Sequence, residues 1–198
     1  MFIQVIQGKT SDAEGLRRQF ERWQQELGAG ATGYLGTTGG VAEDGTAVIL
    51  ARFEDEAAAR ANSDRPAQAA WWEETAKLFD GEVTFRDCWD VDTMEGGGSD
   101  DAGFVQVMQG RVRDRDRLRE LEEQHMPQMR EQRPDVIGMV RAWDGDFFTS
   151  AVYFTSEADA RKGEASDAAG GGPADDEFSS LFGDITYIDL KDPWLRSP

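Results

Sequence analysis

The sequence is poor in the residues on which disulfide frameworks and many active sites depend. Its 198 residues include one cysteine, Cys88, and one histidine, His125. A single cysteine forms no disulfide within the chain, which is typical of a reducing compartment. Cys88 lies between Phe85 and Trp89 in a stretch that resembles a strand. We therefore interpret it as a small buried hydrophobic residue and not as a nucleophile.

Basic residues are also scarce. The chain has 21 Lys and Arg against 39 Asp and Glu, which gives a formal net charge of −18. Nucleic acids and anionic membrane surfaces need a basic face, so neither is expected as a partner. We interpret the acidity as a solvated surface that favours solubility, the alternatives being a basic partner or a halophilic or high-GC source.

Long apolar runs are missing as well. No stretch approaches the roughly 18 apolar residues of a membrane span. The N-terminus leads directly into a strand, without the basic region and apolar run of a signal peptide. These features predict a soluble, cytoplasmic protein.

The common catalytic and ligand-binding motifs are absent too. The sequence shows no metal-ligand spacing, no Ser–His–Asp arrangement, and no glycine loop with P-loop or dinucleotide spacing. The acidic run Glu54–Glu56 lies where a helix should begin, and there it suits the helix dipole without a metal. We therefore expect no metal and no cofactor.

The chain does contain an internal repeat. Phe2–Gly8 returns as Phe104–Gly110, with the Phe, both Gln and the Gly in the same places. Two further pairs of phrases match in the same order: Glu56–Arg60 with Glu157–Arg161, and Phe79–Phe85 with Phe182–Tyr187. These matches predict a tandem duplication with a repeat at 1–91, a flexible Gly-rich acidic linker at 92–103, a second repeat at 104–190, and a tail at 191–198.

Both repeats have the pattern strand, helix, strand, strand, helix, strand. In repeat one, a strand at 2–7 precedes a helix whose apolar residues share one face: Leu16, Phe20, Trp23 and Leu27. The later elements of repeat one are expected as strands at 32–38 and 47–53, a hairpin turn at 43–45, a helical region from 55 that restarts at Pro66, and a strand at 82–91.

Repeat two follows the same order. Its first helix runs from about 114 or 116 to 132, and Pro127 should kink or split it. Asp144–Gly145 predicts a hairpin between strands at 136–143 and 147–154, and Gly170–Gly172 should break the last helical region. The pattern is that of a ferredoxin-like unit, so the predicted fold class is α+β. The uncovered sheet faces predict two tandem units that form a pseudo-dimeric barrel within one chain.

The element order, the opening phrase and the aromatic second helix resemble the dimeric α+β barrel superfamily, and in particular the antibiotic biosynthesis monooxygenase-like (ABM) domains. The resemblance implies a ligand cavity between helices and sheet in each unit. Members include cofactor-free oxygenases of aromatic polyketides, haem-degrading enzymes and many proteins of unassigned role. A haem-degrading member would have a histidine near Trp71 and a tryptophan about two positions before Ser63. Both are absent here, which disfavours haem degradation.

His125 is the first candidate catalytic residue. It stands where repeat one has Trp23, on a helical stripe that also carries Leu118, Leu121 and Met129. A histidine titrates near neutral pH, so it could act as a general base or as a haem ligand. The alternatives are a half-buried histidine that is hydrogen-bonded to a neighbour, or a residue at the rim near the break at Pro127. If the chain has one working site, this difference places the site in repeat two.

Gln7 and Gln109 end the first strands of the two repeats. If Ile3, Val5, Val105 and Val107 face the helices, alternation places these two amides on the helix-facing side, where a cavity could be. Gln4 and Gln106 would then lie inside the barrel in a structural hydrogen-bonded network.

The remaining candidates are aromatic or cationic. Trp71 and Trp72 could hold a flat ligand, although core packing is the alternative for both. Arg141 should share a face with Met139 and Trp143. There it could pair with an anionic oxygen, or it could be a salt-bridge residue at an outer edge.

The sequence therefore leaves three functions open. The first is a cofactor-independent monooxygenase-like enzyme acting on a flat phenolic or quinone-like molecule. His125 would be its base, Arg141 or Gln109 would stabilise the oxyanion, and Trp23, Trp71 and Trp72 would exclude water. Gln7 and Trp143 complete the expected ligand-binding residues. The second is a non-catalytic small-molecule-binding or stress-related protein, and the third is haem binding through His125. The expected partner is a small molecule, and the chain would be a monomer or a weak dimer.

Overall fold

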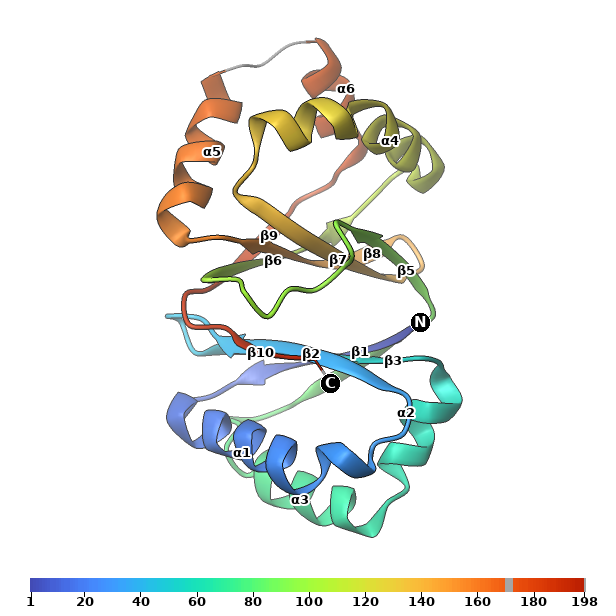
Figure 1. Cartoon of the computed structure of the whole chain (residues 1–198), viewed down its shortest axis with the longest axis vertical. Helices are drawn as coiled ribbons and strands as arrows, with labels where there is room; N and C mark the ends of the chain where they lie inside the picture. The colour runs from blue at the N-terminus through green and yellow to red at the C-terminus, as the bar shows by residue number, and fades with distance from the viewer. Residues whose placement is uncertain (170–172, 198) are drawn as a thin grey trace. The chain divides into compact units, whose positions relative to one another are not determined.

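The computed structural model describes residues 1–169 and 173–197, with side chains except at 167–169 and 173–176 (Figure 1). The predicted break at Gly170–Gly172 lies outside the described residues. The chain divides into two compact units. Unit 1 comprises Met1–Val91 and the C-terminal residues from Asp192 onward, and unit 2 comprises Asp92–Lys191.

The first repeat folds in the predicted order. Its elements are β1 (Phe2–Lys9), α1 (Ala13–Glu26), the 3₁₀ turn η1 (Gly28–Gly30), β2 (Tyr34–Val41), β3 (Thr46–Phe53), α2 (Glu56–Ser63), α3 (Pro66–Ala76) and β4 (Thr84–Cys88).

The second repeat has the same order after one additional strand. Its elements are β5 (Asp90–Met94), β6 (Phe104–Arg111), α4 (Arg115–Gln132), β7 (Val136–Asp144), β8 (Phe147–Phe154), α5 (Glu157–Ala169), α6 (Pro173–Leu181) and β9 (Thr186–Leu190), followed by β10 (Trp194–Arg196).

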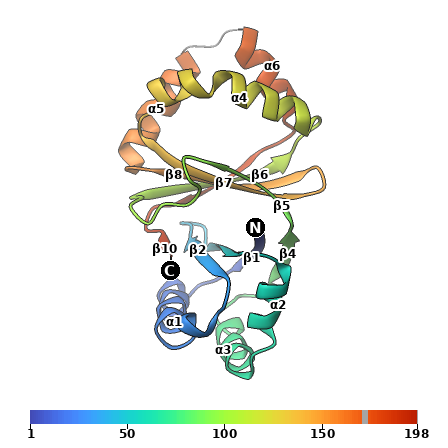
Figure 2. The same ribbon diagram turned by 45° about the vertical axis from the view of Figure 1, so that its right-hand side comes forward.

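The strands form two five-stranded antiparallel sheets of matching topology, β10-β2-β3-β1-β4 and β5-β7-β8-β6-β9. Within each unit the helices cover one face of its own sheet (Figure 2). The predicted α+β class and the two tandem ferredoxin-like units are confirmed. The joining of the two sheets into one barrel stays a prediction.

Each of the two hairpin turns contains a glycine with a left-handed backbone conformation. Gly45 and Gly145 adopt φ values of 80° and 63° between paired strands. Residues with a side chain rarely adopt this left-handed region, whereas glycine does so without steric cost. The two hairpins predicted from the sequence are therefore present, between β2 and β3 and between β7 and β8.

Two short edge strands were missed by the sequence prediction. Residues 92–94, expected as flexible linker, continue β5 and extend the second sheet beside β7. The expected tail contains β10, where Trp194 pairs with Gly39 of β2. Both strands are short and lack an alternating pattern, because they are fixed by pairing with an existing sheet edge and not by their own sequence.

The expected facing of the first strands was wrong. Phe2 packs with Trp23 of α1, and Gln4 lies on the same helix-facing side of β1. By alternation, Gln7 lies on the opposite face. Unit 2 repeats this, since Gln106 bonds Glu164 of α5 and Gln109 therefore faces away from the helices. Apolar residues are buried on both faces of these strands, so the hydrophobic pattern did not identify the helix-facing side.

Three further observations complete the fold. Helix α4 continues through Pro127 as one element, so the proline does not split it. Cys88 is buried, as expected of a small hydrophobic residue. Among the described helices, none is long and apolar enough to cross a membrane.

Candidate functional site

An apolar cavity of about 90 Å³ lies in unit 1, between the sheet and its covering helices. Aromatic rings form much of its wall, among them Phe20, Trp23, Tyr34 and Trp71. The sequence expectation favoured repeat two for a single site, whereas this cavity belongs to repeat one.

Helix α1 places Phe20 and Trp23 on the cavity. Asp12 caps the helix by accepting a 2.8 Å hydrogen bond from the N–H of Gly15. The helical period then brings Phe20 and Trp23 onto one inward face with Leu16. The indole of Trp23 donates to Gln68 Oε1 over 2.6 Å, and this bond fixes the orientation of the ring.

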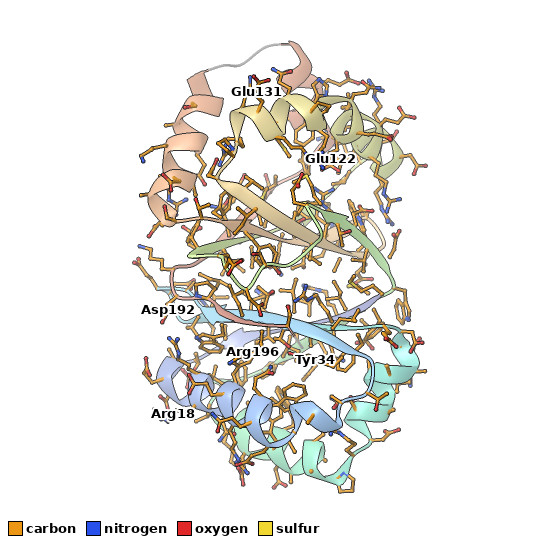
Figure 3. The ribbon with its side chains drawn as sticks, viewed as in Figure 1. Arg18, Tyr34, Glu122, Glu131, Asp192 and Arg196 are labelled. Atoms are coloured by element: carbon orange, nitrogen blue, oxygen red, sulfur yellow. The ribbon has the colours of Figure 1, made fainter. Side chains whose placement is uncertain are left out.

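The β2 strand contributes Tyr34, which Figure 3 shows in the space between the sheet and the helices of unit 1. Its ring meets Trp23 edge to face, with centroids 4.9 Å apart. Its hydroxyl accepts from Gln24 Nε2 over 2.9 Å and donates to Thr37 Oγ1 over 2.7 Å. Two hydrogen bonds at the hydroxyl thus fix the orientation of the Tyr34 ring in this wall.

Helix α3 supplies the third wall. Pro66 stands in its first turn, where a missing N–H costs nothing. Trp71 donates to the carbonyl of Gln19 over 3.0 Å and is thereby tied to α1. Trp72 packs against Phe85 with centroids 5.2 Å apart. Both tryptophans therefore line the cavity while also serving the core.

The C-terminal strand closes the cavity from the sheet edge. Trp194 lies on β10, lines the cavity, and packs on Phe20 with centroids 5.9 Å apart. An ion pair between Arg17 and Asp192 ties this segment to α1, and its hydrogen bond raises the pKa of the Arg17 guanidinium. At the edge of the sheet, β10 forms three residue pairs with β2. Trp194 is therefore held in the wall by a short edge strand and by its packing on Phe20.

The cavity lining carries no formal charge. Among its described residues there is no Asp, Glu, Lys, Arg or His. Its polar members are amides and hydroxyls, including Gln4, Thr37, Asn62 and Gln68. Such a lining suits a neutral, largely apolar ligand, because an unpaired ion in this environment is costly.

In unit 2 the matching space between helix and sheet holds an ion pair. Arg141 of β7 donates to both carboxylate oxygens of Glu122 in α4, over 2.9 and 2.6 Å, and to Ser150 Oγ over 2.9 Å. Figure 3 shows Glu122 between α4 and the sheet of unit 2. Asp92 of β5 lies 4.0 Å from Arg141. Only 7% of the Arg141 side chain is exposed, so this ion pair is part of the interior.

The register of the strands identifies the matching positions in unit 1. Ile6 pairs with Ile49, which pairs with Gly39, whereas Met108 pairs with Ser150, which pairs with Arg141. Arg141 thus replaces Gly39, and Ser150 replaces Ile49. Helices α1 and α4 are capped alike by Asp12 and Asp114, so Glu122 replaces Phe20. The change from an apolar cavity to an ion pair is therefore coordinated across three elements.

The residues expected to be catalytic do not line the cavity of unit 1. His125 is half-buried on α4, and its Nδ1 lies 2.7 Å from the carbonyl oxygen of Leu121. A carbonyl only accepts, so Nδ1 carries the proton of this bond. Arg141 is bound as described, and Gln109 donates to Thr149 Oγ1 over 3.2 Å on the face away from the helices.

The residues expected to bind a ligand divide into two groups. Trp23, Trp71 and Trp72 meet at the cavity. Gln7 lies on the opposite face of β1, and the indole of Trp143 in unit 2 donates to Asp92 over 2.7 Å.

The sequence reasoning missed Tyr34, Asn62 and Trp194. Comparison of the two repeats could have pointed to the cavity. Phe20 of repeat one is matched by Glu122 of repeat two, and a glutamate is rare on a buried helix face.

A metal centre finds no support in the described part of the chain. There, no group of three or more His, Cys, Asp or Glu side chains is placed to hold a metal ion.

Comparisons with known proteins connect this fold to monooxygenase-like proteins. No family model and no curated protein matches the sequence. A Fusobacterium nucleatum protein, provisionally named a monooxygenase, matches with a TM-score of 0.73 at 9% identity, over 99% of this chain and 94% of that chain. A Lactobacillus acidophilus protein of the same provisional name matches with a TM-score of 0.72 at 11% identity, over 99% and 95%. A protein named anthrone oxidase-like gives 0.65 at 10% identity, over 99% and 92%.

At these identities the likeness is one of fold. It extends over both units, so the duplicated ferredoxin-like fold and its resemblance to the monooxygenase-like domains are confirmed at that level.

Proposed function

We propose that unit 1 binds a small, flat, uncharged aromatic molecule in its cavity and acts on it as a cofactor-independent monooxygenase-like protein. The observation that carries this proposal is the aromatic, charge-free lining around Trp23, Trp71 and Trp194. Flat rings pack favourably on such faces. The names of the solved structures with the same fold support the reaction class, since two are provisionally named monooxygenases and one anthrone oxidase-like.

The size of the cavity limits the ligand. Its volume of about 90 Å³ is smaller than the roughly 150 Å³ of an apolar cavity that holds benzene in another protein. A single ring is therefore the largest planar group that a modest movement of the wall would admit. Trp194 is the side chain that we expect to move, because its strand is short and lies at the sheet edge.

The lining also limits the chemistry. It offers no carboxylate, amine or imidazole to remove a proton from the ligand. A neutral phenol or enol bound there must therefore give its acidic proton to solvent as it passes one electron to O2. The substrate is oxidised to a neutral radical and O2 is reduced to superoxide. The radical, the superoxide and a proton from solvent then combine to a ring hydroperoxide, while the tryptophans keep bulk water from the ring. The same lack of a base favours a second candidate function, which is binding of the ring without turnover.

Transferring the ion pair of unit 2 into unit 1 tests the proposal. In the variant Phe20→Glu/Gly39→Arg/Ile49→Ser, the serine also makes room, since a Cβ on Gly39 would lie 3.1 Å from Ile49 Cγ1. We expect this variant to fold and to lose both ring binding, followed by tryptophan fluorescence, and oxygen uptake with phenols and single-ring quinols. The control Trp143→Phe should keep both. Retained binding in a folded triple variant would contradict the proposal, and binding without oxygen uptake in the parent chain would select the second candidate function.

A further inference from the structure

Two neutral amides in the cavity wall are each bonded to a charged group behind them. Asn62 Oδ1 accepts a 2.6 Å hydrogen bond from Arg65 Nη2. Gln4 Nε2 donates a 2.9 Å hydrogen bond to Asp87 Oδ1. Both amides line the cavity, whereas Arg65 and Asp87 do not.

The charged partners fix which end of each amide remains available. A guanidinium only donates, so the oxygen of Asn62 points to Arg65 and its NH2 is the other end. A carboxylate only accepts, so the NH2 of Gln4 points to Asp87 and its oxygen is the other end. Within the part of the chain that the structure describes, Asn62 Nδ2 finds no acceptor and Gln4 Oε1 finds no donor. Asn62 is nevertheless 93% buried, since its exposed fraction is 7%.

The charged partners also change how strongly each amide donates or accepts a further hydrogen bond. Hydrogen bonds that share a group polarise one another inside a protein. The Arg65 cation forms no ion pair with the described residues, and it draws electron density from the Asn62 carbonyl. The NH2 of Asn62 thereby becomes a stronger donor. The Asp87 carboxylate acts in the opposite sense, so the oxygen of Gln4 becomes a stronger acceptor.

We infer that the ligand of unit 1 is an uncharged single-ring compound with both a hydroxyl donor and an oxygen acceptor. The hydroxyl donates to Gln4 Oε1, and a carbonyl or similar oxygen accepts from Asn62 Nδ2. The ring lies against the tryptophans. An anionic ring such as a benzoate is rejected, because the lining contains no cation to pair with it. The inference rests on the proposed function, since it assigns the polar groups of that ring.

The test uses five probe molecules that share one ring. At a pH below the pKa of the phenols and above that of the benzoate, 4-hydroxybenzaldehyde has donor and acceptor, phenol has the hydroxyl alone, benzaldehyde has the acceptor alone, toluene has neither, and 4-hydroxybenzoate is an anion. We expect 4-hydroxybenzaldehyde to bind the full chain about fivefold more tightly than phenol or benzaldehyde, because each additional neutral hydrogen bond contributes about 1 kcal/mol. Toluene should bind more weakly still, and 4-hydroxybenzoate should not bind.

Two nearly isosteric variants then separate the amides. Gln4→Met should make 4-hydroxybenzaldehyde bind no better than benzaldehyde. Asn62→Asp keeps the partner of Arg65 but loses the donor, so 4-hydroxybenzaldehyde should bind no better than phenol. The matched control is Gln106→Met, because Gln106 makes the same bond to Asp189 in unit 2, over 3.0 Å, and does not line this cavity. It should leave all five affinities unchanged.

The outcomes distinguish this inference from the proposed function. Equal binding of toluene and 4-hydroxybenzaldehyde, or equal losses in all three variants, overturns the role of the two amides while ring binding stands. Failure of every ring to bind the parent chain overturns the proposed function itself.

Discussion

Arg141 donates two hydrogen bonds to Glu122 at the place where unit 1 has Gly39 and Phe20. The two halves of a duplicated chain have thus adopted different interiors on one backbone. Unit 1 has a neutral aromatic cavity, and unit 2 has a buried ion pair that ties α4 to β7. This asymmetry is the basis for the proposal that a ligand binds in unit 1.

The first prediction concerns the ion pair. Arg141→Ala leaves Glu122 partly buried without its partner, so the free energy of unfolding should fall by about 3–5 kcal/mol. The double variant Glu122→Leu/Arg141→Met removes both charges and should restore most of that loss. Urea unfolding measures both. If the double variant is as unstable as Arg141→Ala, the ion pair itself and not the avoidance of an unpaired charge determines the stability.

The second prediction concerns the size limit set by Trp194. Trp194→Ala removes the ring that closes the cavity at the sheet edge, so two-ring ligands such as naphthol should gain roughly tenfold in affinity, about 1.4 kcal/mol. Trp194→Phe should give a smaller gain, and Trp89→Ala, at an indole that is 61% exposed, should give none. Calorimetric titration with phenol and naphthol provides the measurement. Unchanged selectivity in Trp194→Ala would mean that another wall sets the limit.

The third prediction concerns His125. Because it lies on α4 of unit 2, His125→Ala should leave ring binding and oxygen uptake within about twofold of the parent, with a loss of stability of about 1 kcal/mol for the lost hydrogen bond. Steady-state oxygen uptake with a phenol that the parent oxidises measures the effect. A hundredfold loss of rate in a folded variant would return the catalytic role to this histidine.

The fourth prediction concerns pH. Since the described cavity lining contains no carboxylate, amine or imidazole, the rate of oxygen uptake at saturating substrate should rise with pH as the bound neutral substrate gives up its proton to solvent more readily. A more acidic phenol should therefore reach half of its maximal rate at a correspondingly lower pH. Rates for a series of substituted phenols check this. A profile that is the same for all substrates would point to a protein group instead.

The sequence predicted the architecture well because local signals agree with it. The repeated phrase, the helical stripe with Phe20 and Trp23, and the hairpin glycines each specify one element. The sequence did not predict strands β5 and β10, because they form by pairing with a sheet edge and not from a local sequence pattern. The sides of β1 on which Gln4 and Gln7 lie were predicted wrongly, because both faces of this strand bury apolar residues.

The site was harder to predict than the fold. A single histidine drew attention to repeat two, because histidine is the side chain most often used near neutral pH. The residues that form the cavity are aromatic and amide side chains, and these have no chemical signature in a sequence. Their significance lies in the comparison with unit 2, where Phe20 and Gly39 correspond to Glu122 and Arg141. The match of Phe20 with Glu122 follows from the repeat itself, whereas the match of Gly39 with Arg141 required the strand register.

The central claim is that ligand binds in unit 1, and the six tryptophans of the chain allow a direct measurement. Each indole N–H gives one resonance in a ¹H–¹⁵N correlation spectrum, which can be assigned by single Trp→Phe substitutions. On titration with 4-hydroxybenzaldehyde, we predict shifts for the four tryptophans that line the cavity: Trp23, Trp71, Trp72 and Trp194. Trp89 and Trp143 should not move. A shift of the Trp143 resonance, with the resonances of the four cavity tryptophans unchanged, would contradict the account and place binding in unit 2.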